Sequence, residues 1–309
     1  TSSQAWRVNT TSGTVTAEVT KNVVSWRDIP YAQPPVGALR WRAPRPVESP
    51  LGELSVRDNV ACLQVAWDGG GIPGDGVVGA EDCLYLDITA PVGASAVEPL
   101  PVMFWIHGGG NTSGFKGYYD FSTLVESQQV IVVAINYRLG PFGWFSHPVV
   151  QKQAEGLDRS SNFGTLDIIQ ALSWVQQNIS EFGGDAKNVT LFGESAGGHN
   201  VFALLASPLS EGLFQKAISQ SGYLKTNTVE EAINADDDYP RIRRSSSQLF
   251  ASMVDAGVLA DVSTKSAYDV AGNTLMEYYL ELNDQGDVPL TTADGIVISK
   301  EGMLAALAD

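Results

Sequence analysis

The sequence predicts an α/β fold with a mostly parallel central sheet and an antiparallel N-terminal edge. From Leu100 to Gly222, apolar runs of strand length alternate with helical stretches, which is typical of βαβ units. Between Val8 and Ala32, short β-like runs are separated by a turn at Ser12-Gly13, which indicates antiparallel strands. The chain has 309 residues, of which 44% are hydrophobic, so it can bury a large core.

Within the parallel region, the expected elements can be placed in order along the chain. Short apolar runs predict strands, and longer periodic runs predict helices. We expect strands or apolar strand-like runs at Val102–Ile106, Val130–Ile135, Asn136–Arg138 and Asn188–Phe192, and helices at Leu166–Ile179 and Val201–Leu205.

The character of the sequence changes from Tyr223 onward. Asp236–Asp238 and Ser245–Ser247 predict solvated loops, and helices are expected near Gln248–Asp255 and Ala267–Leu282. No internal repeat is evident. We therefore divide the chain into an N-terminal β region (residues 1–99), a βαβ core (100–222) and a helical segment (223–309).

Two glycine-rich motifs carry the chemistry of this sequence. The expected strand at Val102–Ile106 leads into His107-Gly108-Gly109-Gly110, whose backbone N–H groups are uncovered by side chains and can meet a developing oxyanion. The second motif, Gly193-Glu194-Ser195-Ala196-Gly197, places a serine on a sharp turn between a strand and a helix. Together they indicate the two halves of an acyl-transfer site.

The second motif taken alone is a weak signal, because glycine and serine are common in this chain. The alternative is a surface turn that happens to contain Ser195. However, a tight strand-to-helix turn needs small neighbours, and Ala196, Gly197 and Gly198 supply them. The presence of both motifs, each after an apolar strand, favours the catalytic interpretation.

These motifs and further blocks along almost the whole chain resemble the type-B carboxylesterases, the cholinesterase-like group of the α/β-hydrolases. The nucleophile block, Phe192–Gly198, is similar to the family signature at every position. The other similar blocks are Ile29–Gly37 with Leu39–Trp41 and Pro44, Glu81–Ile88, Asn136–Gly140, Asn162–Gly164 with Asp167, Ala171–Gln176, Asn178–Ile179, Phe182–Asp185, Ser207–Pro208, Gly212–Phe214 and Ala217–Gly222.

The resemblance implies the α/β-hydrolase fold and a role for each residue of the two motifs. Ser195 would be the nucleophile that forms an acyl-enzyme, and the backbone N–H groups of Gly109, Gly110 and Ala196 would be the oxyanion donors. Glu194 matches a buried acid beside the nucleophile, where a packing and hydrogen-bonding role is at least as consistent as a catalytic one. We expect neither a metal ion nor another cofactor.

The catalytic base is the part of the site that this sequence lacks. In this architecture the triad follows the order Ser, then Asp or Glu, then His, but His199 is the only histidine after Ser195. We expect His199 to point along its helix, away from the serine hydroxyl. We expect His107 to orient the glycine loop through ring hydrogen bonds, and His147 to be structural.

The family's acid and histidine lie in segments beyond residue 309, so residues 1–309 are expected to form one incomplete α/β-hydrolase catalytic domain. The C-terminal strands of the sheet would be missing, and the unpaired edge would be an aggregation hazard. We therefore expect a partner on that edge. The simplest partner is the C-terminal remainder of the same enzyme as a second polypeptide, and a truncated polypeptide is the alternative.

The charge of the chain argues against binding to nucleic acid. The formal net charge is −16, and no basic stripe is present to neutralise phosphates. The short run Arg241–Arg244 is too small to change this conclusion. The longest apolar stretch, Val130–Ile135, is too short to span a membrane.

The two cysteines, Cys62 and Cys83, stand at the family's positions for a disulfide that closes an acidic, glycine-rich loop. The resemblance therefore implies that they are bonded, while two buried free thiols are the alternative. Disulfides persist in oxidising compartments, and the chain starts at Thr1 as a processed secreted protein would. We expect a secreted or periplasmic location.

The resemblance implies a carboxylic ester hydrolase that acts on small-molecule esters. The alternative is a catalytically silent cholinesterase-like protein with a binding or adhesion role, although such relatives tend to lose the nucleophile that this chain retains. A serine peptidase is a third, less favoured possibility. The only aromatic residue of the loop between the cysteines is Trp67, close to the first of them, so a cation–π site for choline is unsupported. Asn111 replaces an aromatic often found after the oxyanion glycines, and we expect it to reshape the acyl pocket.

Overall fold

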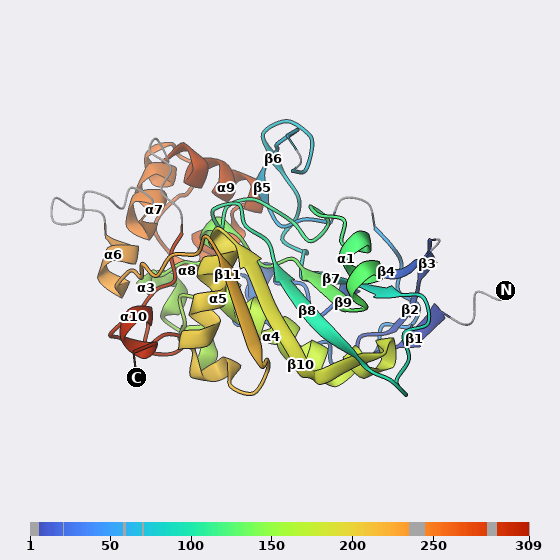
Figure 1. Ribbon diagram of the computed structural model, residues 1–309. Helices are drawn as coiled ribbons and strands as arrows, with labels where there is room; N and C mark the ends of the chain where they lie inside the picture. Colours follow the sequence, from blue (N-terminus) through green and yellow to red (C-terminus); the bar gives the residue numbers. More distant parts are fainter. Residues whose placement is uncertain are drawn as a thin grey trace.

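The computed structural model describes residues 6–20, 22–57, 60–69, 71–234, 245–282 and 289–308. A seven-stranded sheet with the order β11-β10-β8-β9-β7-β4-β3 runs through the molecule (Figure 1). Its strands are β3 (Glu18–Val19), β4 (Val23–Pro30), β7 (Tyr85–Pro91), β8 (Leu100–Ile106), β9 (Ile131–Ile135), β10 (Gly184–Glu194) and β11 (Lys216–Gln220).

The sheet has a parallel part and an antiparallel edge, as predicted. Strands β9, β8, β10 and β11 pair in parallel. Strands β3, β4 and β7 join them through antiparallel pairings. Two small antiparallel ribbons lie outside this sheet, one formed by β1 (Arg7–Asn9) and β2 (Thr14–Thr16), the other by β5 (Gln64–Val65) and β6 (Val77–Val78).

The helices are α1 (Ser122–Gln128), α2 (Gly140–Gly143), α3 (Pro148–Gln151), α4 (Phe163–Asn178), α5 (Ala196–Ala206), α6 (Val229–Ile233), α7 (Ser246–Asp255), α8 (Thr264–Asp269), α9 (Gly272–Glu281) and α10 (Met303–Ala306). Helices α4 and α5 pack against one face of the sheet and α1 against the other, while most of the remaining helices pack on other helices and loops. Short 3-10 turns lie at Gly37–Leu39, Gly156–Arg159, Ile179–Phe182 and Pro208–Ser210.

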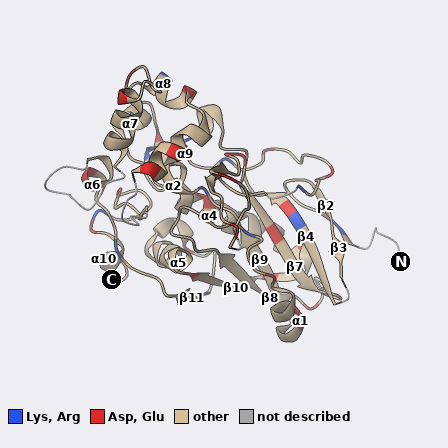
Figure 2. Cartoon of the chain, turned by 90° about the horizontal axis from the view of Figure 1, so that it is seen from above, with Lys and Arg blue, Asp and Glu red and all other residues tan. Residues whose placement is uncertain are grey.

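Side-chain alternation along the strands produces two cores, one on each face of the sheet. In β9, Ile131, Val133 and Ile135 join the large core that α4 and α5 complete, whereas Val132 and Ala134 join a smaller core beside α1. Figure 2 shows α1 on the opposite side of these strands from α4 and α5. The face that carries α1 therefore has much less cover than the other within the described chain.

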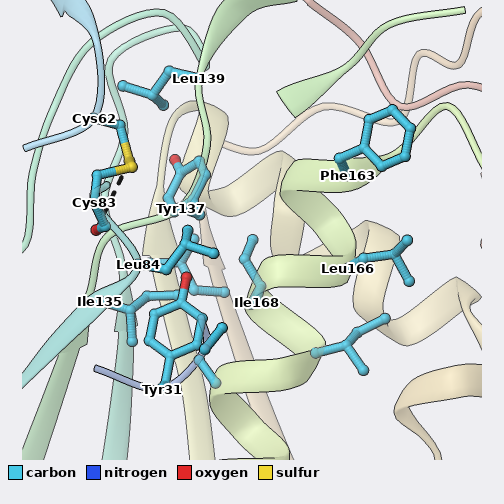
Figure 3. Close-up of a cluster of buried hydrophobic side chains, with 14 of the residues drawn as sticks. Tyr31, Cys62, Cys83, Leu84, Ile135, Tyr137, Leu139, Phe163, Leu166 and Ile168 are labelled. Carbon is cyan, nitrogen blue, oxygen red and sulfur yellow. Dashed lines mark hydrogen bonds between the residues drawn. A yellow bond between two sulfur atoms is a disulfide. The ribbon is translucent and has the colours of Figure 1, made fainter. Parts of the chain in front are cut away.

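The predicted disulfide between Cys62 and Cys83 is present, with a Cα–Cα distance of 4.9 Å. Both cysteines are buried in the large core, next to Leu84 and Tyr137 (Figure 3). The disulfide closes the loop that contains the β5–β6 ribbon, which projects from the body of the molecule (Figure 1).

Three expectations about local structure are wrong. Asn136–Arg138 is a loop after β9 and not a strand, because the backbone N–H of Arg138 donates to Asp167 (3.0 Å) and not to a neighbouring strand. The helix expected at Ala267–Leu282 is two helices, α8 and α9. They separate at Val270, whose carbonyl accepts a hydrogen bond from Arg40 (2.8 Å).

The serine run at Ser245–Ser247 is the third correction, because it begins a helix instead of forming a solvated loop. Ser245 and Ser246 are buried, and the Ser245 hydroxyl accepts a hydrogen bond from the Gln248 backbone N–H at the start of α7 (3.3 Å). The expected loop at 236–238 and the basic run at 241–244 lie outside the described residues.

None of the helices in the described part of the chain is long and apolar enough to cross a membrane. The same residues contain no cluster of His, Cys, Asp and Glu side chains that could hold a metal ion. Charged side chains are spread over the elements and do not form a basic stripe in the view of Figure 2.

Candidate active site

Ser195 occupies the sharp turn between β10 and α5. Its φ is +56°, a value that residues other than glycine rarely adopt. The next residue, Ala196, begins the helix. The backbone holds this turn on both sides, since the Ser195 N–H donates to Gln220 O (2.8 Å) and Ser195 O accepts from the His199 N–H (2.9 Å). The serine therefore sits on the strained strand-to-helix elbow that the sequence predicts.

Close backbone packing places this turn against the end of β8. Ile106, the last residue of β8, is the register partner of Gly193, the residue before the end of β10. A Cβ atom on Gly197 would lie 2.1 Å from Ile106 O, so only glycine allows α5 to start this close to β8. A Cβ atom on Gly108 would lie 3.4 Å from the Ser195 Cβ. The glycine run and the serine are thus direct neighbours.

The glycine loop, residues 107–114, presents unpaired backbone donors beside Ser195. Gly109 and Gly110 have φ values of +100° and +63°. Neither N–H donates to any acceptor among the described residues, and Ala196, as the first residue of α5, has no acceptor within its helix. The family resemblance implies these three donors for the oxyanion hole, and no acceptor in the described part of the chain occupies any of them.

His107 is buried and holds the start of this loop. Its ring stacks on Tyr137 with centroids 4.3 Å apart, and Nδ1 lies 2.8 Å from Gly108 O. Because a carbonyl can only accept, Nδ1 carries the proton and donates. Burial lowers the pKa of His107 to about 4, so the ring is neutral at neutral pH. Its environment agrees with the orienting role expected of it.

The other two histidines are engaged away from the serine hydroxyl. His199 is buried, with Nδ1 donating to Tyr223 O (2.9 Å) and Nε2 accepting from the Thr291 hydroxyl (2.9 Å). His147 caps α3, where Nδ1 accepts from the Val149 N–H (3.2 Å). No hydrogen bond connects any of these imidazoles to Ser195 within the described structure.

Glu194 differs from expectation, because it is exposed and not buried. It is the last residue of β10 and follows Phe192 by two positions, so it points to the thinly covered face that Phe192 shares with Trp105 and Val125. A Cβ atom on Gly108 would lie 3.0 Å from Glu194 Oε2, so the carboxylate borders the glycine loop.

Asn111 anchors the glycine loop, which its sequence position did not reveal. Its side chain is fully buried, with Nδ2 donating to Pro289 O (3.2 Å) and Oδ1 accepting from Asn200 Nδ2 (3.0 Å). Its carbonyl accepts from the Gly140 N–H (2.7 Å). These bonds give Asn111 a role in fixing the loop to α5, and its effect on an acyl pocket stays a prediction.

Comparison with known proteins agrees with this geometry. A sequence model of the carboxylesterase family matches residues 4–257. The para-nitrobenzyl esterase of Bacillus subtilis is 42% identical over 273 residues, which cover 85% of this chain and 51% of that protein. The fumonisin B1 esterase of Sphingopyxis macrogoltabida is 44% identical over 220 residues, covering 69% of this chain and 39% of that protein.

Solved structures show the same fold over nearly the whole chain. A structure of PNB esterase aligns with a TM-score of 0.79 and 34% identity, covering 98% of this chain and 60% of that one. The carboxylesterase EST55 of Geobacillus stearothermophilus aligns with a TM-score of 0.78 and 30% identity, covering 97% of this chain and 58% of that one. The α/β-hydrolase fold is thereby confirmed. The chain spans roughly half the length of the para-nitrobenzyl esterase and of these solved structures.

Proposed function

Because the chain belongs to the carboxylesterase family, we propose that it carries the nucleophile and the oxyanion hole of a carboxylic ester hydrolase. The observation that supports this most directly is the juxtaposition of Ser195 and the glycine loop. The serine sits on the elbow at a φ of +56°, and the N–H groups of Gly109 and Gly110 are unpaired beside it. Acyl transfer requires a nucleophile and N–H donors that are free to bind the oxyanion.

In the proposed reaction, Ser195 Oγ bonds to the ester carbonyl carbon while its proton passes to an imidazole. The carbonyl oxygen becomes an oxyanion, which accepts hydrogen bonds from Gly109, Gly110 and Ala196. The alcohol then leaves with the proton from the imidazole, and Ser195 remains acylated. Water adds to the acyl-enzyme by the same route and releases the acid.

We propose that the imidazole and the triad acid come from the C-terminal remainder of the enzyme. Among the described residues, no ring nitrogen of His107, His147 or His199 is hydrogen-bonded to Ser195, so a base from elsewhere fits this site. The edge strand β11 also fits a partner, because it pairs only with β10 in the described structure and leaves Ile218 46% exposed. This remainder can be continuous with the chain or a second polypeptide, and an intact-mass measurement distinguishes the two.

The Cys62–Cys83 disulfide favours an oxidising location for the enzyme, and we propose that it is secreted or periplasmic. Localisation can be tested by fractionating the producing cells. A silent binding protein is the competing function. It would have no use for a strained serine beside unpaired N–H groups, so the site favours catalysis.

The test is labelling of the complete protein by a fluorophosphonate probe, which reacts quickly only with an activated serine. We expect one probe per molecule on Ser195, hydrolysis of a short-chain p-nitrophenyl ester, and little hydrolysis of the matching anilide. Ser195→Ala should lose both labelling and turnover. Equal labelling of the Ala variant would refute the assignment of Ser195, and an unlabelled, inactive wild type would favour the binding protein.

A further inference from the structure

We propose that Gln64 is a positioning residue that holds the glycine loop in the geometry needed to bind the oxyanion. The proposal rests on the function proposed above, in which Gly109 and Gly110 are oxyanion donors. Gln64 lies on β5, two residues after the disulfide-bonded Cys62, and it is far in sequence from the loop that it contacts.

The side-chain amide of Gln64 pairs with the backbone of Gly114 on both sides. Oε1 accepts from the Gly114 N–H (2.9 Å), and Nε2 donates to Gly114 O (2.9 Å). Nε2 also donates to Cys62 O (3.0 Å). Gln64 is 1% exposed, so these bonds are shielded from water. Only one orientation of the amide satisfies both groups of Gly114, because the opposite one would face donor to donor and acceptor to acceptor.

Gly114 in turn packs back onto the start of its own loop. Its φ is +105°, and a Cβ atom there would lie 2.3 Å from His107 Nδ1 and 2.6 Å from Gly108 O. The end of the loop thus lies directly on the residues that precede the two donors. Holding Gly114 therefore holds His107 and Gly108 in place.

A second anchor lies on the other side of the donors. Asn111 is bonded to Asn200 on α5 and to Pro289 O. Gly109 and Gly110 therefore lie between two fixed parts of the loop. Asn111 is held by Asn200 on α5, and Gly108 is held through Gly114 by Gln64. Removing either anchor frees one side of the donor pair, and displacement of a catalytic group by about 1 Å can cost about 100-fold in rate.

In this arrangement the disulfide also contributes to the position of Gln64, in addition to stabilising the chain. Cys62 supplies both a sulfur to the bridge and a carbonyl to Gln64. The covalent bond to Cys83 therefore fixes the backbone from which Gln64 reaches the glycine loop. The distinguishing feature of a positioning role is that losing Gln64 should affect the transition state more than substrate binding.

The test compares Gln64→Met with Gln176→Met. Methionine keeps a similar length and removes the hydrogen bonds in both. Gln176 is a matched control because its Nε2 also donates to two backbone carbonyls, Ala186 O and Leu213 O (both 2.9 Å). None of these residues contacts the glycine loop through a hydrogen bond described above. The first readout is amide hydrogen exchange of Gly114 in the complete protein, which requires no catalysis.

We expect Gln64→Met to raise the exchange rate of the Gly114 amide at least about tenfold, and Gln176→Met to leave it within about twofold, because a protecting hydrogen bond is lost only in the first. In the complete enzyme, Gln64→Met should lower kcat by about 10- to 100-fold with KM changed less than about threefold, whereas Gln176→Met should retain kcat. The pH profile should keep its shape, since no titrating group is altered.

Unchanged Gly114 exchange in Gln64→Met, or a kcat within twofold of wild type, would overturn the proposal. So would a KM effect that accounts for the whole loss of kcat/KM. An inactive wild type with normal Gly114 protection would instead contradict the proposed function, and the exchange experiment would still decide whether Gln64 holds the loop.

Discussion

Ser195 shows how the fold stores energy at a single residue. A side chain at a φ of +56° with a ψ of −118° costs about 1–3 kcal/mol relative to relaxed backbone. The cost persists because the Ser195 N–H and carbonyl are both bonded, to Gln220 O and to the His199 N–H. In such a turn the side chain points outward from the backbone between β10 and α5. This orientation suits a side chain that must contact a substrate.

The first prediction uses this strain. Ser195→Gly should be more stable than Ser195→Ala by about 1–2 kcal/mol, because glycine adopts positive φ without a Cβ clash. At Ser252, inside α7, the order should invert, with Gly about 1 kcal/mol less stable than Ala. Urea unfolding of the four variants of residues 1–309 measures both differences. Equal stability of the two Ser195 variants would show that the turn is not strained.

The second prediction concerns the buried ion pair between Arg138 and Asp167. Arg138 Nε and Nη2 donate to the two oxygens of Asp167 (2.8 and 2.7 Å), and both residues are buried. Asp167→Ala should cost about 3–5 kcal/mol, because it leaves a guanidinium buried and unpaired. The same change at Asp269, in the exposed pair with Lys265, should cost less than about 1 kcal/mol.

A double variant separates the value of this pair from the cost of breaking it. Arg138→Met with Asp167→Leu should recover much of the stability lost in Asp167→Ala, because no charge then remains buried. Chemical unfolding of residues 1–309 provides all of these values. A loss below about 1 kcal/mol in Asp167→Ala would mean that water reaches Arg138, contrary to its burial.

At the level of secondary structure, α5 connects the nucleophile to distant segments through His199. Its ring stacks on Tyr223 with centroids 4.4 Å apart, and Nε2 accepts from both the hydroxyl and the N–H of Thr291 (2.9 and 3.3 Å). Protonation of Nε2 would break the bond from the Thr291 N–H and would place a charge in a buried site. Burial lowers the pKa of His199 to about 4.

The third prediction follows from that pKa. The unfolded chain binds a proton at His199 near pH 6.5, but the folded chain binds it only near pH 4. Stability from this residue is therefore complete above pH 6.5 and is lost as the pH falls toward 4, by up to about 1.4 kcal/mol per pH unit. His199→Gln should be less stable at pH 7.5 and should show a shallower loss between pH 6.5 and 4.5.

Urea unfolding at several pH values measures this slope, and comparison with the wild type cancels the contribution of the carboxylates. His107, whose pKa burial also lowers to about 4, remains in both proteins and should keep part of the slope. An identical slope in the wild type and His199→Gln would show that His199 is protonated in the folded chain or free of its partners.

The elements themselves could be predicted where a local pattern determines them. The apolar runs that became β8, β9 and β10 and the periodic run that became α4 are properties of neighbouring residues. The break between α8 and α9 was not predictable in this way, because Arg40, which binds the Val270 carbonyl, is 230 residues away. The anchors of the glycine loop, Gln64 and Asn200, escaped prediction for the same reason.

The residues of the candidate site also divide into those set by a local pattern and those set by distant segments. Ser195 and the glycine donors could be placed because each motif is continuous in sequence and follows its own strand. The exposure of Glu194 could not, since burial depends on what covers the sheet face next to it. The sequence predicted only that His199 points away from the serine hydroxyl. Its partners, Tyr223 and Thr291, could not be predicted because they come from separate segments.

At the level of the whole molecule, the cover of the sheet is uneven. The face with α4 and α5 has a large core, whereas the opposite face has a small one beside α1. Strand β11 pairs on one side only within the described residues, and alternate residues along it are exposed. Glu194 points to this thinly covered face, as Phe192 does. A segment that packs here would complete the small core.

The last prediction is that residues 1–309 alone are essentially inactive as an esterase. No imidazole among the described residues bonds to Ser195, so proton transfer from Oγ lacks its base. Loss of the base in a serine hydrolase lowers kcat by about 10⁴- to 10⁶-fold and leaves only the contribution of binding and the oxyanion hole. Hydrolysis of a p-nitrophenyl ester by residues 1–309 should therefore match that of the Ser195→Ala variant.

Adding a polypeptide with the family's remaining C-terminal strands and histidine should restore turnover, and restoration should fail with Ser195→Ala. Isolated residues 1–309 should also react slowly with a fluorophosphonate probe, because the oxyanion donors alone do not deprotonate the serine. Full turnover by the isolated chain would contradict this account, and loss of that turnover in His199→Gln or His147→Gln would identify the base on this chain. If the complete protein is active and the isolated chain is not, the base of the reaction lies outside residues 1–309.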